Sequence, residues 1–95
     1  MIRVIRFTAN WCAPCATFAP IFENVQLQFA NSGVSFSVVD IDKQPEIARQ
    51  YGVKAIPTTI IEQRGKVLSQ LPGVYSLDSL KSIINETIKK NKLLS

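Results

Sequence analysis

The sequence predicts an α/β fold, with a four-stranded mixed sheet flanked by helices and the element order βαβαββα. Two observations favour it. Apolar residues alternate between strand-like runs and helical spacing along the chain, and a short connection containing Gly65 joins two β-rich runs. A chain of 95 residues, 46% of them apolar, can bury one core, so we expect a single domain over residues 1–95.

The first half of the chain predicts a strand, a long helix and a second strand. Residues 2–8 form an apolar run interrupted by Arg3 and Arg6, typical of a strand covered on both faces. Apolar residues then recur at helical spacing, which predicts a helix over about residues 12–31. This stripe consists of Phe18, Ile21, Phe22, Val25 and Phe29. Residues 34–40 predict the second strand, and its inward positions are Val34, Phe36 and Val38.

The second half predicts a short helix, a hairpin and a last helix. Pro45 falls near the start of a helix expected over residues 42–51. Residues 58–61 and 67–71 are β-rich and are separated by a turn, which predicts an antiparallel pair. The last helix is expected over residues 77–90. Its buried stripe should comprise Leu77, Leu80, Ile84 and Ile88.

Composition excludes several classes of function. The net charge of +4 includes a basic end, Lys89, Lys90 and Lys92, which suits the C-terminal dipole of a helix. No aromatic residue interleaves these lysines, so we expect no nucleic-acid partner. No apolar run approaches the ~20 residues that span a bilayer, and the first residues resemble a strand rather than a signal peptide. The expectation is therefore a cytoplasmic monomer without a membrane partner.

The two cysteines, Cys12 and Cys15, are the only ones in the chain. They follow the first predicted strand and begin the long helix, a context that favours redox chemistry for a C-x-x-C pair. A purely structural disulfide would close too short a loop to add much stability. A metal site would need further ligands at suitable spacing, and none is found, so we expect no metal.

The segment Trp11-Cys12-Ala13-Pro14-Cys15 resembles the active site of the thioredoxin family, whose usual form is W-C-G-P-C. Other landmarks also fall at family-like spacing: Pro20, Asp42, Ile56-Pro57-Thr58, Gly65 and Gly73. Members of the family typically carry an additional strand and helix before the strand that leads to the cysteines. The resemblance implies a thiol–disulfide oxidoreductase that reduces protein disulfides. Its partners would be disulfide-containing proteins and a reductase or another dithiol as electron donor, with no cofactor beyond the Cys12–Cys15 pair.

The position of each cysteine predicts its role. Cys12 should be the attacking nucleophile, because unpaired amides and the dipole at a helix N-terminus favour a thiolate. Cysteines in such positions have pKa values of roughly 3.5–7.5 instead of ~8.5. Cys15, one turn further on, should resolve the mixed disulfide.

The resemblance also implies a substrate-binding rim. Ile56-Pro57 resembles the family's cis-proline loop, which faces the cysteines. Trp11 could be ordinary core but is better explained as rim, and Gly73 with Val74 either completes the rim or forms a plain turn. The residues assigned to substrate binding are Trp11, Ala13, Pro14, Ile56, Pro57, Gly73 and Val74.

Three positions bear on how far the family pattern extends to this chain. Arg6 stands where the family buries an aspartate, and Val38 stands where the family has that aspartate's lysine partner. If the Arg6 guanidinium reaches the site it would favour thiolates and tune the pair; otherwise it extends to solvent and only its stem covers the core. Asp42 matches an acidic position near the site, or caps the helix at Pro45.

Two other functions use the same residues. The fold could serve as a binding module or accessory subunit of a larger enzyme, with the exposed rim as its interface. It could also be a more oxidising disulfide oxidase or isomerase, which differs from a reductase only in reduction potential.

Overall fold

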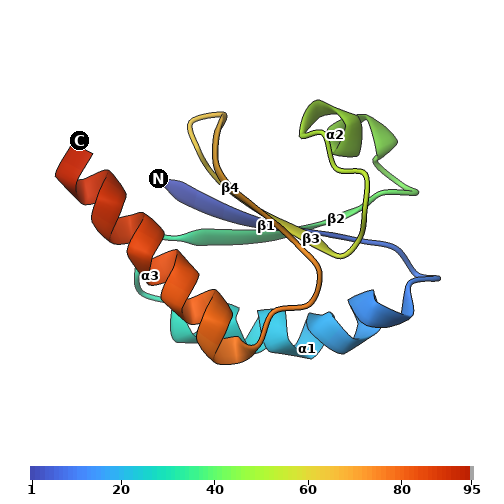
Figure 1. Cartoon of the computed structure of the whole chain (residues 1–95), viewed down its shortest axis with the longest axis horizontal. Coiled ribbons are helices and arrows are strands. Elements are labelled where there is room, and N and C mark those ends of the chain that lie inside the picture. Colours follow the sequence, from blue (N-terminus) through green and yellow to red (C-terminus); the bar gives the residue numbers. More distant parts are fainter. Residues whose placement is uncertain (95) are drawn as a thin grey trace.

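The structure is a computed structural model that describes residues 1–94, with side chains through residue 91, so the side chain of Lys92 and the whole of Ser95 lie outside the described part. The element order βαβαββα is confirmed (Figure 1). The elements are β1 (Ile2–Thr8), α1 (Ala13–Gln28), β2 (Ser35–Asp40), α2 (Pro45–Gln50), β3 (Thr58–Gln63), β4 (Lys66–Pro72) and α3 (Leu77–Leu94).

The four strands form one mixed sheet in the order β2-β1-β3-β4. Strand β1 pairs in parallel with β2 and antiparallel with β3, and β3 and β4 form the predicted antiparallel hairpin. Figure 1 shows α1 and α3 on one side of this sheet and α2 on the other. β1 is therefore a central strand, and its end leads directly to the cysteines.

Two apolar clusters hold these layers together. The larger one joins the sheet to α1 and α3, and its buried members are Ile2, Val4, Phe18, Phe22, Val25, Phe29, Ile61, Leu80 and Ile84. The smaller one joins the opposite face to α2, and its buried members are Ile5, Phe7, Val39, Ala48 and Ile60. Successive β1 residues alternate between the two clusters, as strand periodicity requires. The stripes predicted for α1 and α3 are confirmed as core-facing.

Several predicted boundaries were wrong. Helix α1 was expected to reach residue 31 but ends at Gln28, because the Phe29 amide donates to both Val25 and Gln26 and the chain then turns. Helix α2 was expected over residues 42–51 but covers only Pro45–Gln50. Its predicted first turn is instead a separate turn, in which the Asp40 carboxylate accepts the amide hydrogens of residues 42 and 43.

The remaining strands and helix differ from prediction by smaller amounts. β2 begins one residue later than expected. In the hairpin, β3 (Thr58–Gln63) extends two residues further at its C-terminal end, and β4 (Lys66–Pro72) extends one residue further at each end. α3 extends to Leu94 rather than ending at residue 90. Val38 was expected to alternate inward with Val34 and Phe36 but is 49% exposed, because β2 is an edge strand; its buried residue Val39 lies on the opposite face, against α2. Within residues 1–94, no helix is both long and apolar enough to cross a bilayer.

Candidate functional site

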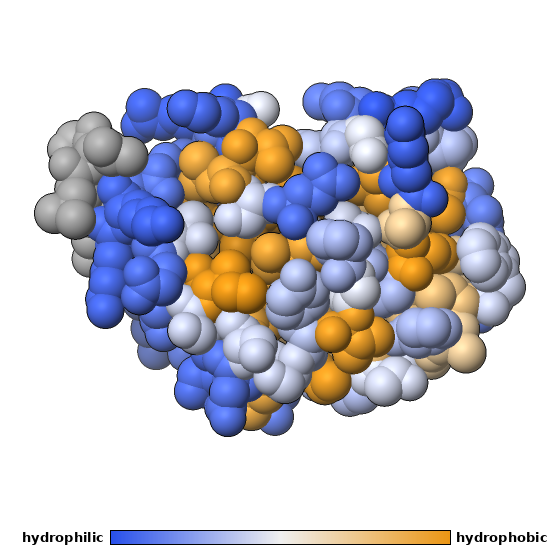
Figure 2. All heavy atoms as spheres, viewed as in Figure 1, coloured by the Kyte–Doolittle hydropathy of each residue, from blue (hydrophilic) through white to orange (hydrophobic). Residues whose placement is uncertain are grey.

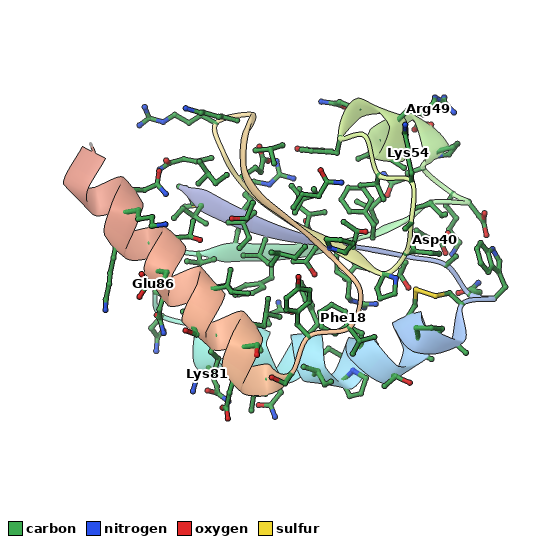
Figure 3. All side chains as sticks on the ribbon, in the orientation of Figure 1. Phe18, Asp40, Arg49, Lys54, Lys81 and Glu86 are labelled. Carbon is green, nitrogen blue, oxygen red and sulfur yellow. A yellow bond between two sulfur atoms is a disulfide. The ribbon has the colours of Figure 1, made fainter. Side chains whose placement is uncertain are left out.

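The two cysteines lie at the junction of β1 and α1 and form a disulfide, visible in yellow at the N-terminal end of α1 in Figure 3. Cys12 is the N-cap residue, with an extended backbone, and Cys15 lies in the first turn. Their Cα atoms are 5.2 Å apart, and the Cys15 amide donates to Cys12 Sγ at 3.2 Å. Pro14 occupies the first turn, where its missing N–H leaves no intrahelical bond unmade. The helix start thus aims the Cys15 amide hydrogen at the sulfur of Cys12.

The two sulfurs differ in access to solvent. Cys12 is 7% exposed and Cys15 only 1%. Both pack with Ala9 in a small apolar cluster, against which Ile41 and Ile56 are also packed. A substrate that approaches from solvent therefore meets the sulfur of Cys12 first.

A loop before β3 faces Cys12 from across the site. The Ile56–Pro57 peptide bond is cis, as the family resemblance implies. The Ile56 carbonyl oxygen lies 3.9 Å from Cys12 Sγ. The Gly73 amide donates to the Pro57 carbonyl at 2.7 Å and so joins the segment after β4 to this loop. Residues far apart in the sequence thereby meet at one end of the sheet.

Trp11 is on the surface, so the alternative that it belongs to the core was wrong: 69% of it is exposed. Its indole Nε1 donates to Asp42 Oδ2 at 2.8 Å. The alternative that Asp42 caps α2 was also wrong, since Gln44 is the N-cap residue and no side-chain cap bond forms there.

Val74, the other exposed apolar residue assigned to the rim, is 44% exposed. Figure 2 shows apolar surface toward the right-hand end of the molecule, below the hydrophilic surface at the upper right.

Arg6 is buried, with 8% of the residue exposed, so the alternative in which it extends to solvent was wrong. Its guanidinium carbon lies 5.4 Å from the centre of the Phe22 ring, and its Nε atom has no hydrogen-bond partner. Burial lowers the pKa of Arg6, and the negative charge of Glu23 partly opposes that effect. Val38, its neighbour in the sheet, offers no charge to pair with it.

A cavity of about 270 Å³ adjoins the cysteine pair. Its lining comprises Arg6, Thr8, Ala9, Asn10, Cys12, Cys15, Ala16 and Ala19. A larger hollow of about 580 Å³ lies between α1 and β2 and contacts neither cysteine. Among residues 1–94, no group of three or more potential metal ligands comes together.

Two features of the site were missed from the sequence. The first is the Trp11–Asp42 hydrogen bond, for which the sequence carries no local signal. The second is the cavity wall on α1, which a signal could have revealed: positions 12, 15, 16 and 19 share one helical face, and Ala16 and Ala19 are too small to fill the space beside it.

Comparison with known proteins identifies this arrangement. The family model for thioredoxin matches residues 1–86. The chain belongs to the thioredoxin family. It is 38% identical to thioredoxin H4 of Arabidopsis thaliana over 84 residues, which covers 88% of this chain and 70% of the relative. It is 39% identical to the thioredoxin of Chlamydia caviae over 83 residues, which covers 87% of this chain and 79% of the relative.

Solved structures agree with the sequence relatives. The thioredoxin of Malassezia sympodialis, Mala s 13, superposes with a TM-score of 0.82 at 33% identity, covering 90% of this chain and 73% of the other. The fold class predicted from the sequence is confirmed. The chain is a thioredoxin-type thiol–disulfide oxidoreductase, and the Cys12–Cys15 disulfide is its redox-active pair.

Proposed function

We propose that this member of the thioredoxin family reduces disulfides in other proteins, with Cys12 as the attacking nucleophile and Cys15 as the resolving thiol. The observation that carries the proposal is the difference between the two sulfurs. Cys12 is the more exposed one and receives the Cys15 amide hydrogen at the helix start, whereas Cys15 is enclosed. A helix N-terminus stabilises negative charge on a sulfur placed there.

The reaction balances in two exchanges. The Cys12 thiolate attacks one sulfur of the substrate disulfide, forms a mixed disulfide and releases the other substrate sulfur as a thiolate. Cys15 then loses its proton to solvent and attacks Cys12 Sγ. This second step releases the remaining substrate thiolate and leaves the Cys12–Cys15 disulfide. The substrate has gained two electrons, which a reductase or another dithiol must return to the pair.

The substrate-binding role of the rim belongs to the same proposal. Trp11 and Val74 are exposed apolar side chains, and Ile56 presents its carbonyl oxygen near Cys12. An extended substrate segment could pair with the backbone at Ile56 while its side chains cover the rim. Ala13, Pro14, Pro57 and Gly73 complete the assigned set.

The working unit we propose is a monomeric single domain over residues 1–95, acting in the reducing environment of the cytoplasm. Support for the single domain comes from the sheet, since all four strands join in it and helices cover both its faces. A C-x-x-C pair in a reducing compartment is kept available for catalysis rather than locked as a structural staple.

The test is reduction of insulin disulfides with dithiothreitol as the electron source. The Cys12→Ser variant should lose activity and form no adduct. The Cys15→Ser variant should lose turnover but accumulate a mixed disulfide through Cys12, detectable by mass under non-reducing conditions. An adduct that forms only in Cys12→Ser would reverse the assigned roles. A wild-type protein without reductase activity would contradict the proposal and favour the binding-module alternative.

A further inference from the structure

One buried charged group has no part in the exchange chemistry described above. Arg6 is the sixth residue of the chain, on the central strand β1, and 8% of it is exposed. Its Nε atom is enclosed without a hydrogen-bond partner. A buried donor without a partner opposes folding, so the burial of this group does not by itself stabilise the fold.

The cavity described above connects Arg6 with the redox pair. Arg6, Cys12 and Cys15 line the same space of about 270 Å³. Apart from the two cysteines, the other lining residues are neutral, so Arg6 is the lining residue that brings a positive charge to this space. An electric field in a small, partly enclosed space is screened less than it would be in bulk water.

The position of the guanidinium sets the scale of the effect. Its carbon lies 5.4 Å from the centre of the Phe22 ring. Phe22 follows Cys15 by seven residues and Cys12 by ten, which corresponds to ~10 Å and ~15 Å along a helix axis. At separations of ~10–15 Å, and at the effective dielectric constant of ~20 that suits protein sites, one unit charge changes an ionisation equilibrium by roughly five- to fifteenfold. Glu23 lies close enough to offset part of this charge.

We propose that Arg6 is a positioning residue that acts on the cysteine pair through its charge. Its guanidinium stabilises the thiolate form of the reduced pair, so Cys12–Cys15 is a weaker reductant than it would be with a neutral residue at position 6. A thiolate-stabilising charge favours the reduced state over the disulfide. Arg6 itself transfers neither electrons nor protons. The inference rests on the proposed function only in taking Cys12–Cys15 as the pair that cycles.

The experiment is a redox equilibrium with dithiothreitol, quantified by alkylating free thiols and measuring the mass. In this equilibrium the Cys12–Cys15 disulfide takes two electrons from dithiothreitol, which closes to its own cyclic disulfide; of the two protons that dithiothreitol loses, the protein pair takes up one for each thiol it forms, and solvent takes the proton of any sulfur that stays a thiolate. Arg6→Met should shift the equilibrium about tenfold toward the protein disulfide, equivalent to ~30 mV for a two-electron couple. Arg6→Lys should stay within about threefold of wild type. Lys66→Met removes an exposed charge from the hairpin, at the opposite end of the sheet, and should change the equilibrium by less than about twofold.

The outcomes separate this inference from the proposed function. An Arg6→Met equilibrium within about twofold of wild type, or a Lys66→Met shift as large as that of Arg6→Met, would overturn it. If Arg6→Met does not fold, Glu23→Gln on the exposed face of α1 replaces it. Removing the offsetting charge should shift the equilibrium toward the reduced pair by about two- to threefold, with Glu86→Gln on α3 as control. Insulin reduction by the wild-type protein is scored independently, so a protein without reductase activity can still show the shift.

Discussion

Trp11 and Asp42 are 31 residues apart in the sequence, yet the indole Nε1 of one donates to the carboxylate of the other at 2.8 Å. Trp11 is otherwise largely surrounded by solvent, with 69% of it exposed. The hydrogen bond therefore restrains a large apolar side chain next to Cys12 that would otherwise sample several rotamers. Asp42 is positioned by its own amide, which donates to the Asp40 carboxylate at 2.9 Å.

Loss of that restraint should weaken substrate binding. Asp42→Ala removes the acceptor, and we expect KM for insulin to rise about three- to tenfold because ordering Trp11 would then oppose binding. The free energy of unfolding should change by less than ~0.5 kcal/mol, since the pair is exposed. Asp78→Ala, in the first turn of α3, is the control for the loss of an exposed aspartate and should leave KM unchanged. An unchanged KM in Asp42→Ala would show that the bond does not matter for binding.

Gly73 should be needed for both stability and activity, whereas Gly33 should be needed for stability alone. Both have a positive φ, +97° and +82°, that favours glycine. Alanine at either position should lower the free energy of unfolding by ~1–2 kcal/mol because of the left-handed backbone. Only Gly73 also donates its amide to the Pro57 carbonyl beside the cysteines. Alanine at position 73 keeps that amide but strains the backbone that carries it, so Gly73→Ala should raise KM in insulin reduction, and Gly33→Ala, which loses similar stability, should not.

Tyr51 should make stability sensitive to alkaline pH. Burial raises its pKa above the ordinary value of 10.0, and a hydrogen bond to the Glu62 side chain and the charge of that carboxylate add to the effect. As pH rises through about 10, the unfolded chain loses the Tyr51 proton while the folded chain retains it. The contribution of Tyr51 is thus fully present below pH 10 and is lost at higher pH.

Urea unfolding between pH 8 and 11.5 measures this effect. The free energy of unfolding of the wild-type protein should fall more steeply above pH 10 than that of Tyr51→Phe, because phenylalanine has no proton to lose. Parallel curves for the two proteins would mean that Tyr51 titrates alike in both states. Tyr75→Phe is the matched control, and its curve should follow the wild type.

The elements and the cysteine pair could be predicted from the sequence because their signals are local. Apolar spacing distinguishes β1 from α1, and the two-residue spacing of the cysteines places both at one helix start. Boundaries were less accurate where a side chain binds backbone amides. The Asp40 carboxylate accepts two amides of the turn before α2, and this kept residues 42 and 43 out of the helix.

The environments of Arg6 and Val38 could not be predicted, because tertiary neighbours determine them. A long side chain on a strand can extend to solvent or lie inward, and only the position of Phe22 on α1 shows which occurs. Val38 follows the strand alternation yet is exposed, because no further strand or helix covers the β2 edge at that point. Periodicity identifies the face of a strand but does not identify what covers it.

The two arginines of β1 should have opposite effects on stability. Arg3 is 51% exposed and its Nη1 lies 3.0 Å from Oε1 of Glu62, a carboxylate that is only 2% exposed. Arg3→Met would leave that buried carboxylate with its hydrogen bonds to the Gly65 amide and Tyr51 but without a cation, and should lower the free energy of unfolding by about 1–2 kcal/mol. Arg6 pairs with no carboxylate within ion-pair distance among the described side chains.

Arg6→Met should therefore leave the free energy of unfolding unchanged or raise it by up to ~2 kcal/mol, because methionine fills similar volume without a buried charge. Urea unfolding of both variants, oxidised and at pH 7, provides the comparison. A loss of more than ~1 kcal/mol in Arg6→Met would mean that the contact with Phe22 stabilises the fold, and Phe22→Leu should then abolish the difference between arginine and methionine at position 6. Stability that is retained or gained, together with a more reducing cysteine pair, would assign the charge of Arg6 to redox tuning rather than to folding.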